Sequence, residues 1–280
     1  MVYRSLLVLL DQDDHHVARV RYAIKLAQSL DCHLVGLAPT GLLELPMLQG
    51  SSSALSELSH HAWQLMRQRT EEAVELFDRA CAAAGFTSRE SLVVEDGKAT
   101  ALIRHSHCCD LVIMSQPEPR TARYAEARAV LEEVVLASAR PTLIVPYAGR
   151  FDPPRRKAMI AWDEGREAAR AVADALPLLS RMEGAQLMTW RPSHRDHDPT
   201  LAARADAFSK WLLWHGVQAE VRTEVSDLPL ADAMLSRAAD LGVDLLVMGA
   251  YGHPRWAQRV LGGATRGILD AMTVPVLMSH

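Results

Sequence analysis

Asp-Leu-Leu-Val-Met-Gly-Ala-Tyr-Gly-His forms residues 244–253, and Gly-Gly-Ala-Thr follows at 262–265. Residues 245–248 are a continuous apolar run of strand length, which is typical of a parallel strand buried on both faces. Gly249 and Gly252 follow this run, and each can adopt a positive φ or let another group approach the backbone. The segment 262–265 stands where the next helix is expected to begin. The stretch therefore predicts a strand, then a glycine loop, then a helix N-terminus.

The start of the last helix is a candidate anion site. Free backbone N–H groups and the positive end of the helix dipole attract anions. Here these groups belong to Gly262, Gly263, Ala264 and Thr265, and the Thr265 hydroxyl adds a donor. We therefore expect this segment, together with Gly249 and Gly252, to hold phosphate. The alternative is that the glycines only allow a tight turn and close helix packing.

The strand of this stretch has a counterpart earlier in the chain. Asp-Leu-Val-Ile-Met at 110–114 corresponds to Asp-Leu-Leu-Val-Met at 244–248, and the segment 140–145 corresponds to 274–278. A single offset of 134 residues maps both pairs. This internal repeat predicts two copies of one α/β unit, joined by a Gly- and Pro-containing linker at 147–156.

Apolar periodicity predicts alternating strands and helices throughout, which favours parallel sheets with helices on both faces. Strands are expected at 6–10, 33–37, 91–94, 111–114, 142–145, 157–162, 186–190, 218–224, 245–248 and within 273–278. Helices are expected at 17–30, 56–84, 99–107, 124–139, 167–181, 201–215, 230–240 and after residue 262. Pro177 is expected to kink its helix or to remove the last turn.

The spacing Gly-x2-Gly-x9-Gly over Gly249, Gly252 and Gly262 resembles the nucleotide signature of the universal stress protein family, and the repeat extends that resemblance over nearly the whole chain. In ATP-binding members the last glycine is followed by Ser or Thr; here Gly263 follows, and Thr265 stands at a hydroxyl-bearing position that the family uses. The departure leaves the backbone cradle intact.

This resemblance implies two tandem Rossmann-like domains of the adenine nucleotide α-hydrolase-like (HUP) type, each with a five-stranded parallel sheet. The expected domains are 1–148, without the glycine motif, and 155–280, with it. Resemblance also implies that the two domains pack as an intrachain pseudo-dimer through their last strands, and that chains can pair again as a homodimer. The implied ligand is ATP, ADP or AMP, with or without magnesium.

Asp163 and Met248 are the residues expected on the nucleoside side of the site. Asp163 ends the first strand of the second copy, where open parallel sheets bind ligands. In the family, the acidic residue at this place lies beside the adenosine. The alternative role is helix N-capping near Gly165. Asp11 is its counterpart in the first copy, where capping is the expected role.

The first copy has lost the glycines of the motif. The offset of 134 residues aligns Ser115, Glu118, Arg128, Ala129 and Leu131 with Gly249, Gly252, Gly262, Gly263 and Thr265. A carboxylate at position 118 repels an anion. We therefore expect the first copy to bind no nucleotide in this mode and to serve as a structural partner.

Composition excludes several other classes. A net charge of −4 and a pI near 6.3 argue against nucleic acid as a main partner. No apolar run reaches the ~20 residues of a membrane span, and the N-terminal run has no small-residue cleavage site. The four cysteines form no CxxC pair, so a reducing cytoplasm is the expected location.

Other clusters have ordinary explanations. Arg255, Arg259, Arg266 and His253 flank the motif and are interpreted as surface residues. The segment 105–109 contains His and Cys, which suit zinc, but Cys109 precedes a buried strand, so no metal is expected. No nucleophile elbow or Walker motif is present, which argues against a robust enzyme.

Three functions therefore remain. The leading hypothesis is a stress-response protein that binds an adenine nucleotide in its C-terminal domain as a regulatory ligand. The second is a scaffold of the same fold without nucleotide, with or without an apolar ligand under residues 41–53. The third is a weak ATPase.

Overall fold

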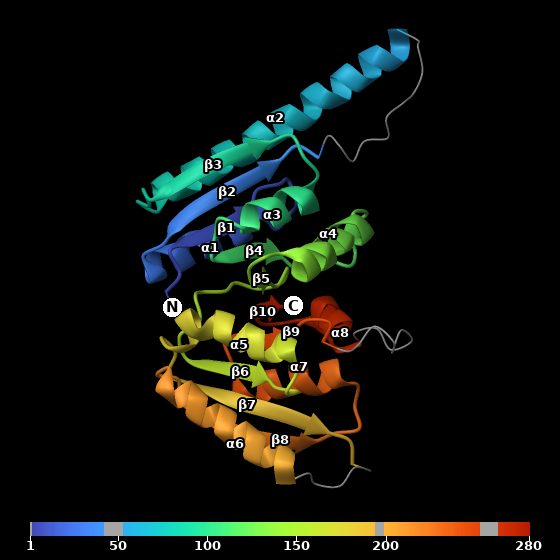
Figure 1. The fold of residues 1–280 in the computed structure, drawn as a ribbon. Coiled ribbons are helices and arrows are strands. Elements are labelled where there is room, and N and C mark those ends of the chain that lie inside the picture. The colour runs from blue at the N-terminus through green and yellow to red at the C-terminus, as the bar shows by residue number, and fades with distance from the viewer. Residues whose placement is uncertain (1, 42–52, 194–198, 253–262) are drawn as a thin grey trace.

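The computed structural model describes residues 2–41, 53–193, 199–252 and 263–280. One sheet runs through the whole molecule, with helices on both of its faces (Figure 1). Residues 42–52, most of the segment under which an apolar ligand was considered, and residues 194–198 lie outside the described residues.

The first half of the chain supplies five strands and four helices among the described residues. These are β1 (Ser5–Leu9), α1 (His16–Leu30), β2 (His33–Pro39), α2 (Ser53–Ala83), β3 (Arg89–Val94), α3 (Lys98–Ser106), β4 (Leu111–Ser115), α4 (Tyr124–Ala137) and β5 (Thr142–Val145).

The second half repeats this order. Its elements are β6 (Lys157–Ala161), α5 (Arg166–Leu179), β7 (Gly184–Arg191), α6 (Pro199–Trp214), β8 (Ala219–Val225), α7 (Leu230–Leu241), β9 (Leu245–Gly249), α8 (Gly263–Ala271) and β10 (Val276–Ser279). The expected elements are all present, with ends that differ by at most three residues. The expected loss of the last turn at Pro177 is wrong, because α5 continues through this proline to Leu179.

The strand order is β3-β2-β1-β4-β5-β10-β9-β6-β7-β8. All pairs within each half are parallel, and β5 pairs antiparallel with β10, where Leu143 is opposite Leu277. The expected contact through the last strands is therefore confirmed. Because this pair is antiparallel, the carboxyl ends of the two sets of parallel strands point in opposite directions.

Strand register confirms the internal repeat. Leu6 pairs with Leu111 in the first half, and Ala158 pairs with Leu245 in the second. Equivalent residues are thus 152 positions apart in β1 and β6, and 134 apart in β4 and β9. The offset of 152 also brings the buried faces of α1 and α5 into register, as Val20 with Val172 and Ala23 with Ala175 show.

The core consists of two apolar layers, one on each face of the sheet. In β1, Leu6 and Val8 belong to one layer, and Leu7 and Leu9 to the other, as the alternation of a strand requires. Helices α1, α2, α5 and α6 cover the first face, and α3, α4, α7 and α8 cover the second. No helix in the described parts of the chain is long and apolar enough to cross a bilayer.

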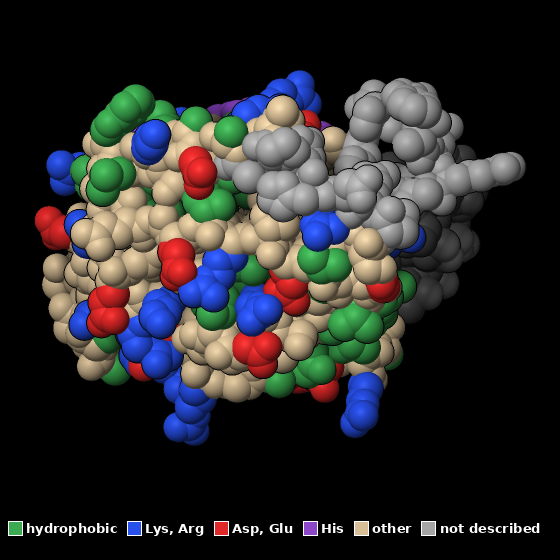
Figure 2. Space-filling view, turned by 90° about the horizontal axis from the view of Figure 1, so that it is seen from below, with side chains coloured by type: hydrophobic (Ala, Val, Ile, Leu, Met, Phe, Trp, Pro, Cys, Tyr) green, Lys and Arg blue, Asp and Glu red, His purple; other side chains and the backbone are tan. Residues whose placement is uncertain are grey.

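Charged side chains cover the β8 end of the sheet. Figure 2 views the molecule from that end and shows Lys and Arg interspersed with Asp and Glu. On β8, Glu220 pairs with Arg222 at 2.6 Å, and Glu224 pairs with Arg237 of α7 at 2.7 Å. Charges along an edge strand discourage pairing with another strand.

Candidate functional site

The candidate site lies where β6 and β9 end in the second half. The two strands are neighbours, and their carboxyl ends lead into Asp163 and the loop 250–252. Asp163 is exposed, and its Oδ1 accepts a hydrogen bond from the Gly165 backbone N–H at 2.8 Å. This turn sets the start of α5 and leaves Oδ2 beside Gly252.

Gly249 allows the first turn of α5 to pack directly on the end of β9. A Cβ at position 249 would lie 2.5 Å from the Ala168 backbone nitrogen and 2.7 Å from the Glu167 carbonyl carbon. No side chain fits there unless the backbone of α5 moves. The close-packing role foreseen as the alternative for these glycines therefore holds for Gly249.

Gly252 faces two carboxylates. A Cβ at this position would lie 3.0 Å from Glu167 Oε2 and 3.8 Å from Asp163 Oδ2. The flexible ends of side chains, rather than backbone, surround this glycine. A ligand group next to Gly252, at the carboxyl ends of β6 and β9, would therefore meet several hydrogen-bond acceptors.

Glu167 is the functional candidate that the sequence interpretation missed. It is only 7% exposed, and Arg166 donates to its Oε1 at 2.9 Å while Oε2 is directed toward Gly252. Burial favours the protonated acid, but the residue's own backbone N–H and Arg166 together lower the pKa of Glu167 below its usual value. The carboxylate is therefore ionised at neutral pH.

The loop after β9 is tied to the start of α8. Tyr251 has a φ of 55°, which is uncommon for a residue with a side chain, and its N–H donates to Thr265 Oγ1 at 3.2 Å. Thr265 is 3% exposed, whereas Gly263 is exposed and a Cβ there would meet nothing within 4 Å. Among the described residues nothing lies close to a Cβ at Gly263, and the anion site expected at the first turn of α8 stays a prediction.

Two of the expected site residues are buried or half-buried. The Met248 side chain is only 4% exposed and belongs to the apolar layer under α7 and α8, so it lies below the edge rather than on it. Ala264 is half-buried in the first turn of α8. Gly262, His253, Arg255 and Arg259 lie outside the described residues.

The corresponding edge of the first half is filled by its own side chains. Arg19, 1% exposed, donates to Asp11 at 2.6 Å, to Asp13 at 2.9 Å and to Ser115 Oγ at 2.7 Å. His15 Nε2 lies 3.2 Å from Glu118 Oε2. The offsets align Arg19 with Ala171, Ser115 with Gly249, and Glu118 with Gly252.

Asp11 does not cap α1, so that expectation is wrong. The residue before the helix is His15, and no side chain caps it. Asp11 is instead a partner of Arg19, because a buried guanidinium requires carboxylates or carbonyls around it. The signal was visible in the sequence: Arg19 lies on the buried side of an amphipathic helix, beside Val20 and Ala23.

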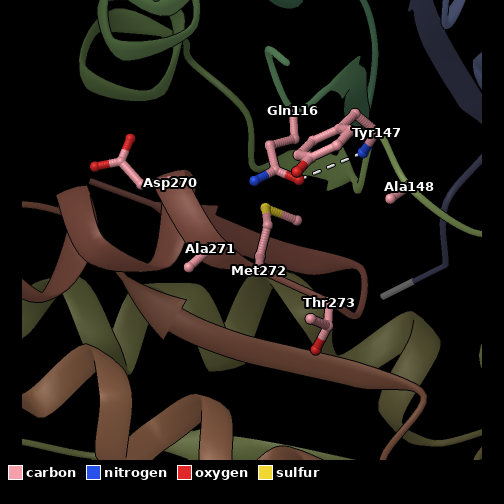
Figure 3. A pocket seen from close by; sticks show the side chains of 7 residues that line it. All are labelled: Gln116, Tyr147, Ala148, Asp270, Ala271, Met272 and Thr273. Carbon is pink, nitrogen blue, oxygen red and sulfur yellow. Dashed lines mark hydrogen bonds between the residues drawn. The ribbon is translucent and has the colours of Figure 1, made fainter. Parts of the chain in front are cut away.

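A pocket lies between the two halves of the chain, away from Gly249 and Gly252. It has a volume of about 140 Å³ and is lined by Gln116, Tyr147, Ala148 and residues 270–273 (Figure 3). Gln116 is fully buried, accepts from the Tyr147 N–H at 3.3 Å and donates to the Leu269 carbonyl at 3.0 Å. Its amide is thus used to join the halves.

The cysteines give no sign of a metal site. Cys109 is 3% exposed, and burial raises its pKa to about 12, while Cys108 is exposed. Across the described ranges, no three His, Cys, Asp or Glu side chains are arranged to hold a metal ion.

Comparisons with known proteins agree with this fold. The Universal stress protein family model matches residues 154–280. A universal stress protein of Synechocystis sp. is 27% identical over 176 residues, which cover 60% of this chain and 57% of that relative. The match thus spans little more than half of that relative's length.

Solved structures extend the agreement to both halves. A universal stress protein from Archaeoglobus fulgidus matches 98% of this chain and 95% of its own, with a TM-score of 0.68 at 16% identity. A protein from Pseudomonas aeruginosa matches 99% of this chain and 93% of its own, with a TM-score of 0.59 at 17% identity. Residues 154–280, in the second half of the chain, match the universal stress protein family model, and both halves share the fold of the Archaeoglobus fulgidus structure.

Proposed function

We propose that the second half binds an adenine nucleotide at the edge formed by β6, β9 and the start of α8. The ligand acts as a regulatory signal in a stress response, and its hydrolysis is at most slow. The match of residues 154–280 to the universal stress protein family model supports this role in general terms.

The observation that carries the proposal is the contrast between the two halves. In the first half, Arg19, Ser115 and Glu118 occupy the edge with hydrogen-bonded side chains. The equivalent second-half residues are Ala171, Gly249 and Gly252, which have little or no side chain. The backbone of α5 takes up the space at Gly249, whereas among the described residues the nearest groups to a Cβ at Gly252 are the carboxylates of Glu167 and Asp163, which a ligand there would meet.

The two ends of the site suit the two ends of a nucleotide. The first turn of α8 offers Gly263, Ala264 and Thr265, whose N–H groups and helix dipole favour phosphate. We place Gly262 with them as the preceding residue of the motif. Asp163, beside Gly252, suits the nucleoside, because carboxylates accept hydrogen bonds from hydroxyl groups. Magnesium, where present, accompanies the phosphates.

Calorimetry with purified, dialysed full-length chain tests the proposal with ATP, ADP and AMP as titrants. Wild type is expected to bind at least one of them. Gly252→Glu, which restores the first-half residue, is expected to abolish binding, because the new side chain fills the edge and adds negative charge. Gly252 has no left-handed φ, so the backbone accepts the change.

The matched control is Gly184→Glu at the start of β7. It makes the same change of charge and volume at the opposite end of the sheet, where a Cβ meets only the Gln218 carbonyl at 3.5 Å. This variant should bind like wild type. Failure of every nucleotide to bind wild type, or equal binding by Gly252→Glu, would reject the proposal.

A scaffold without nucleotide is the second candidate, and the packing of Gly249 favours it. That glycine is needed for contact between α5 and β9 whether or not a ligand binds. A thermal midpoint that does not change with millimolar ATP would support this alternative.

A further inference from the structure

Glu167 and Gly252 are the counterparts of a hydrogen-bonded side-chain pair in the first half. There, His15 and Glu118 occupy the equivalent positions, and their side chains are 3.2 Å apart. In the second half, α5 still presents a charged side chain, but the loop presents a glycine. The Glu167 carboxylate has therefore lost the side-chain partner across the loop that its counterpart has.

The charge next to Gly252 is strongly negative on the loop side. Glu167 Oε2 and Asp163 Oδ2 both lie within 4 Å of the position where a Gly252 Cβ would be. Among the described residues, Arg166, whose side chain is 84% exposed, binds Oε1, and His280 follows β10 nearby. A hydroxyl group can donate to these carboxylates, whereas an anionic group meets like charge from the buried Glu167 and the exposed Asp163.

We infer that Glu167 determines ligand specificity: the site accepts nucleotides with free ribose hydroxyls and rejects nucleotides that carry phosphate on the ribose 2′ or 3′ oxygen. This inference rests on the proposed function. The rejected class includes 3′,5′-cyclic nucleotides, in which the phosphate occupies the 3′ oxygen. Phosphates of accepted ligands extend away from Gly252, toward the first turn of α8.

The size of the effect follows from charged hydrogen bonds. A hydrogen bond to a charged group contributes roughly 1.5–3 kcal/mol, which corresponds to about a 10- to 100-fold change in affinity. Replacing a donated hydroxyl by a phosphate loses this bond and adds repulsion. AMP is therefore expected to bind at least about 30-fold more tightly than 3′,5′-cAMP or 3′-AMP, and 2′,3′-dideoxy-ATP about 10-fold more weakly than ATP.

The test compares these titrants by calorimetry on the full-length chain. Glu167→Gln keeps the size of the side chain and removes its charge, so the AMP-to-cAMP affinity ratio should fall at least about fivefold. Glu118→Gln makes the same change at the filled edge of the first half and should leave the ratio unchanged. Circular dichroism melts verify that both variants are folded.

Each outcome either supports or overturns the role of Glu167 in ligand specificity. Equal or tighter binding of cAMP by wild type overturns the inference while leaving the proposed function in place. A wild-type preference for AMP that persists in Glu167→Gln also overturns it, because another group then discriminates. Binding of none of these nucleotides overturns the inference and the proposed function together. The wild-type ratio alone is informative even if the variant fails to fold.

Discussion

Arg19 fills the space at the carboxyl ends of the first-half strands, and its contribution to the free energy of unfolding can be tested directly. It is a fully buried guanidinium held by Asp11 and Asp13. Arg19→Met keeps most of the apolar stem and removes the guanidinium from Asp13. It leaves Asp11 with Lys98 at 3.8 Å as its cation. Removing one member of a buried pair costs about 3–5 kcal/mol, so the urea midpoint should fall substantially.

Charge removal provides the control for Arg19→Met. Adding Asp11→Asn to the variant should recover part of the loss, because one carboxylate that has lost its guanidinium disappears. A loss below about 1 kcal/mol for Arg19→Met would show that water solvates the carboxylates well, as it does at exposed pairs.

His16 makes stability depend on pH. It is 3% exposed, both ring nitrogens are buried without a partner in the described residues, and burial and Arg19 lower its pKa below the ordinary 6.5. As the pH falls through 6.5, the unfolded chain binds a proton that the folded chain resists, so stability decreases. Urea titrations at about pH 7.5 and pH 5.5 measure this loss.

His16→Ala is the matched variant for the pH effect, because Ala168 is the second-half counterpart. The variant leaves a cavity and is less stable at both pH values, but its stability should change less between them. An unchanged difference between the two pH values would assign the effect to other groups.

At the scale of secondary structure, the junction of β9 and α5 depends on Gly249. Gly249→Ala forces a Cβ against the Ala168 backbone nitrogen, and backbone cannot move aside as a side-chain tip can. Overpacking of this kind costs about 1–3 kcal/mol. Chemical denaturation should show that loss. Gly263→Ala is the control, since nothing lies within 4 Å of its Cβ, and it should be neutral or slightly stabilising.

The elements were predictable from sequence because their signals are local. Apolar runs such as 111–114 and 245–248 are buried on both faces, and the equal spacing of the repeats fixes their correspondence. The carboxyl edge with Asp163, Gly249 and Gly252 followed from the alternation of strands and helices alone.

The contacts within the edge were not predictable, because they depend on how helices approach strands. Glu167 follows Arg166 in an ordinary helical turn, and only the close approach of α5 at Gly249 directs its carboxylate to Gly252. Likewise Met248 has the right position in the sequence, but strand alternation points its side chain into the core. The burial of Arg19 could be read from its helix, but its partners could not, because they lie on the segment after β1 and at the end of β4.

At the scale of the molecule, the antiparallel pair of β5 and β10 makes one sheet from two repeats. Leu143 and Leu277 face each other there and are both fully buried. Across the same boundary, Asp270 accepts from Arg128 and Tyr124, each at 2.7 Å. Apolar and charged contacts thus both cross the boundary, which predicts that the halves unfold together.

Leu143→Ala tests this cooperativity from one side of the boundary. Five of the six tryptophans, all except Trp63, belong to the second half, so in a Trp63→Phe background fluorescence reports only on that half. Truncating a buried leucine costs about 2–5 kcal/mol. Because β5 is shared with β10, the fluorescence midpoint in urea should fall together with the circular dichroism midpoint. The opposite result would be a fluorescence midpoint equal to that of the Trp63→Phe protein together with a biphasic dichroism curve. It would mean that each half unfolds independently and that contacts between β5 and β10 couple the two halves only weakly.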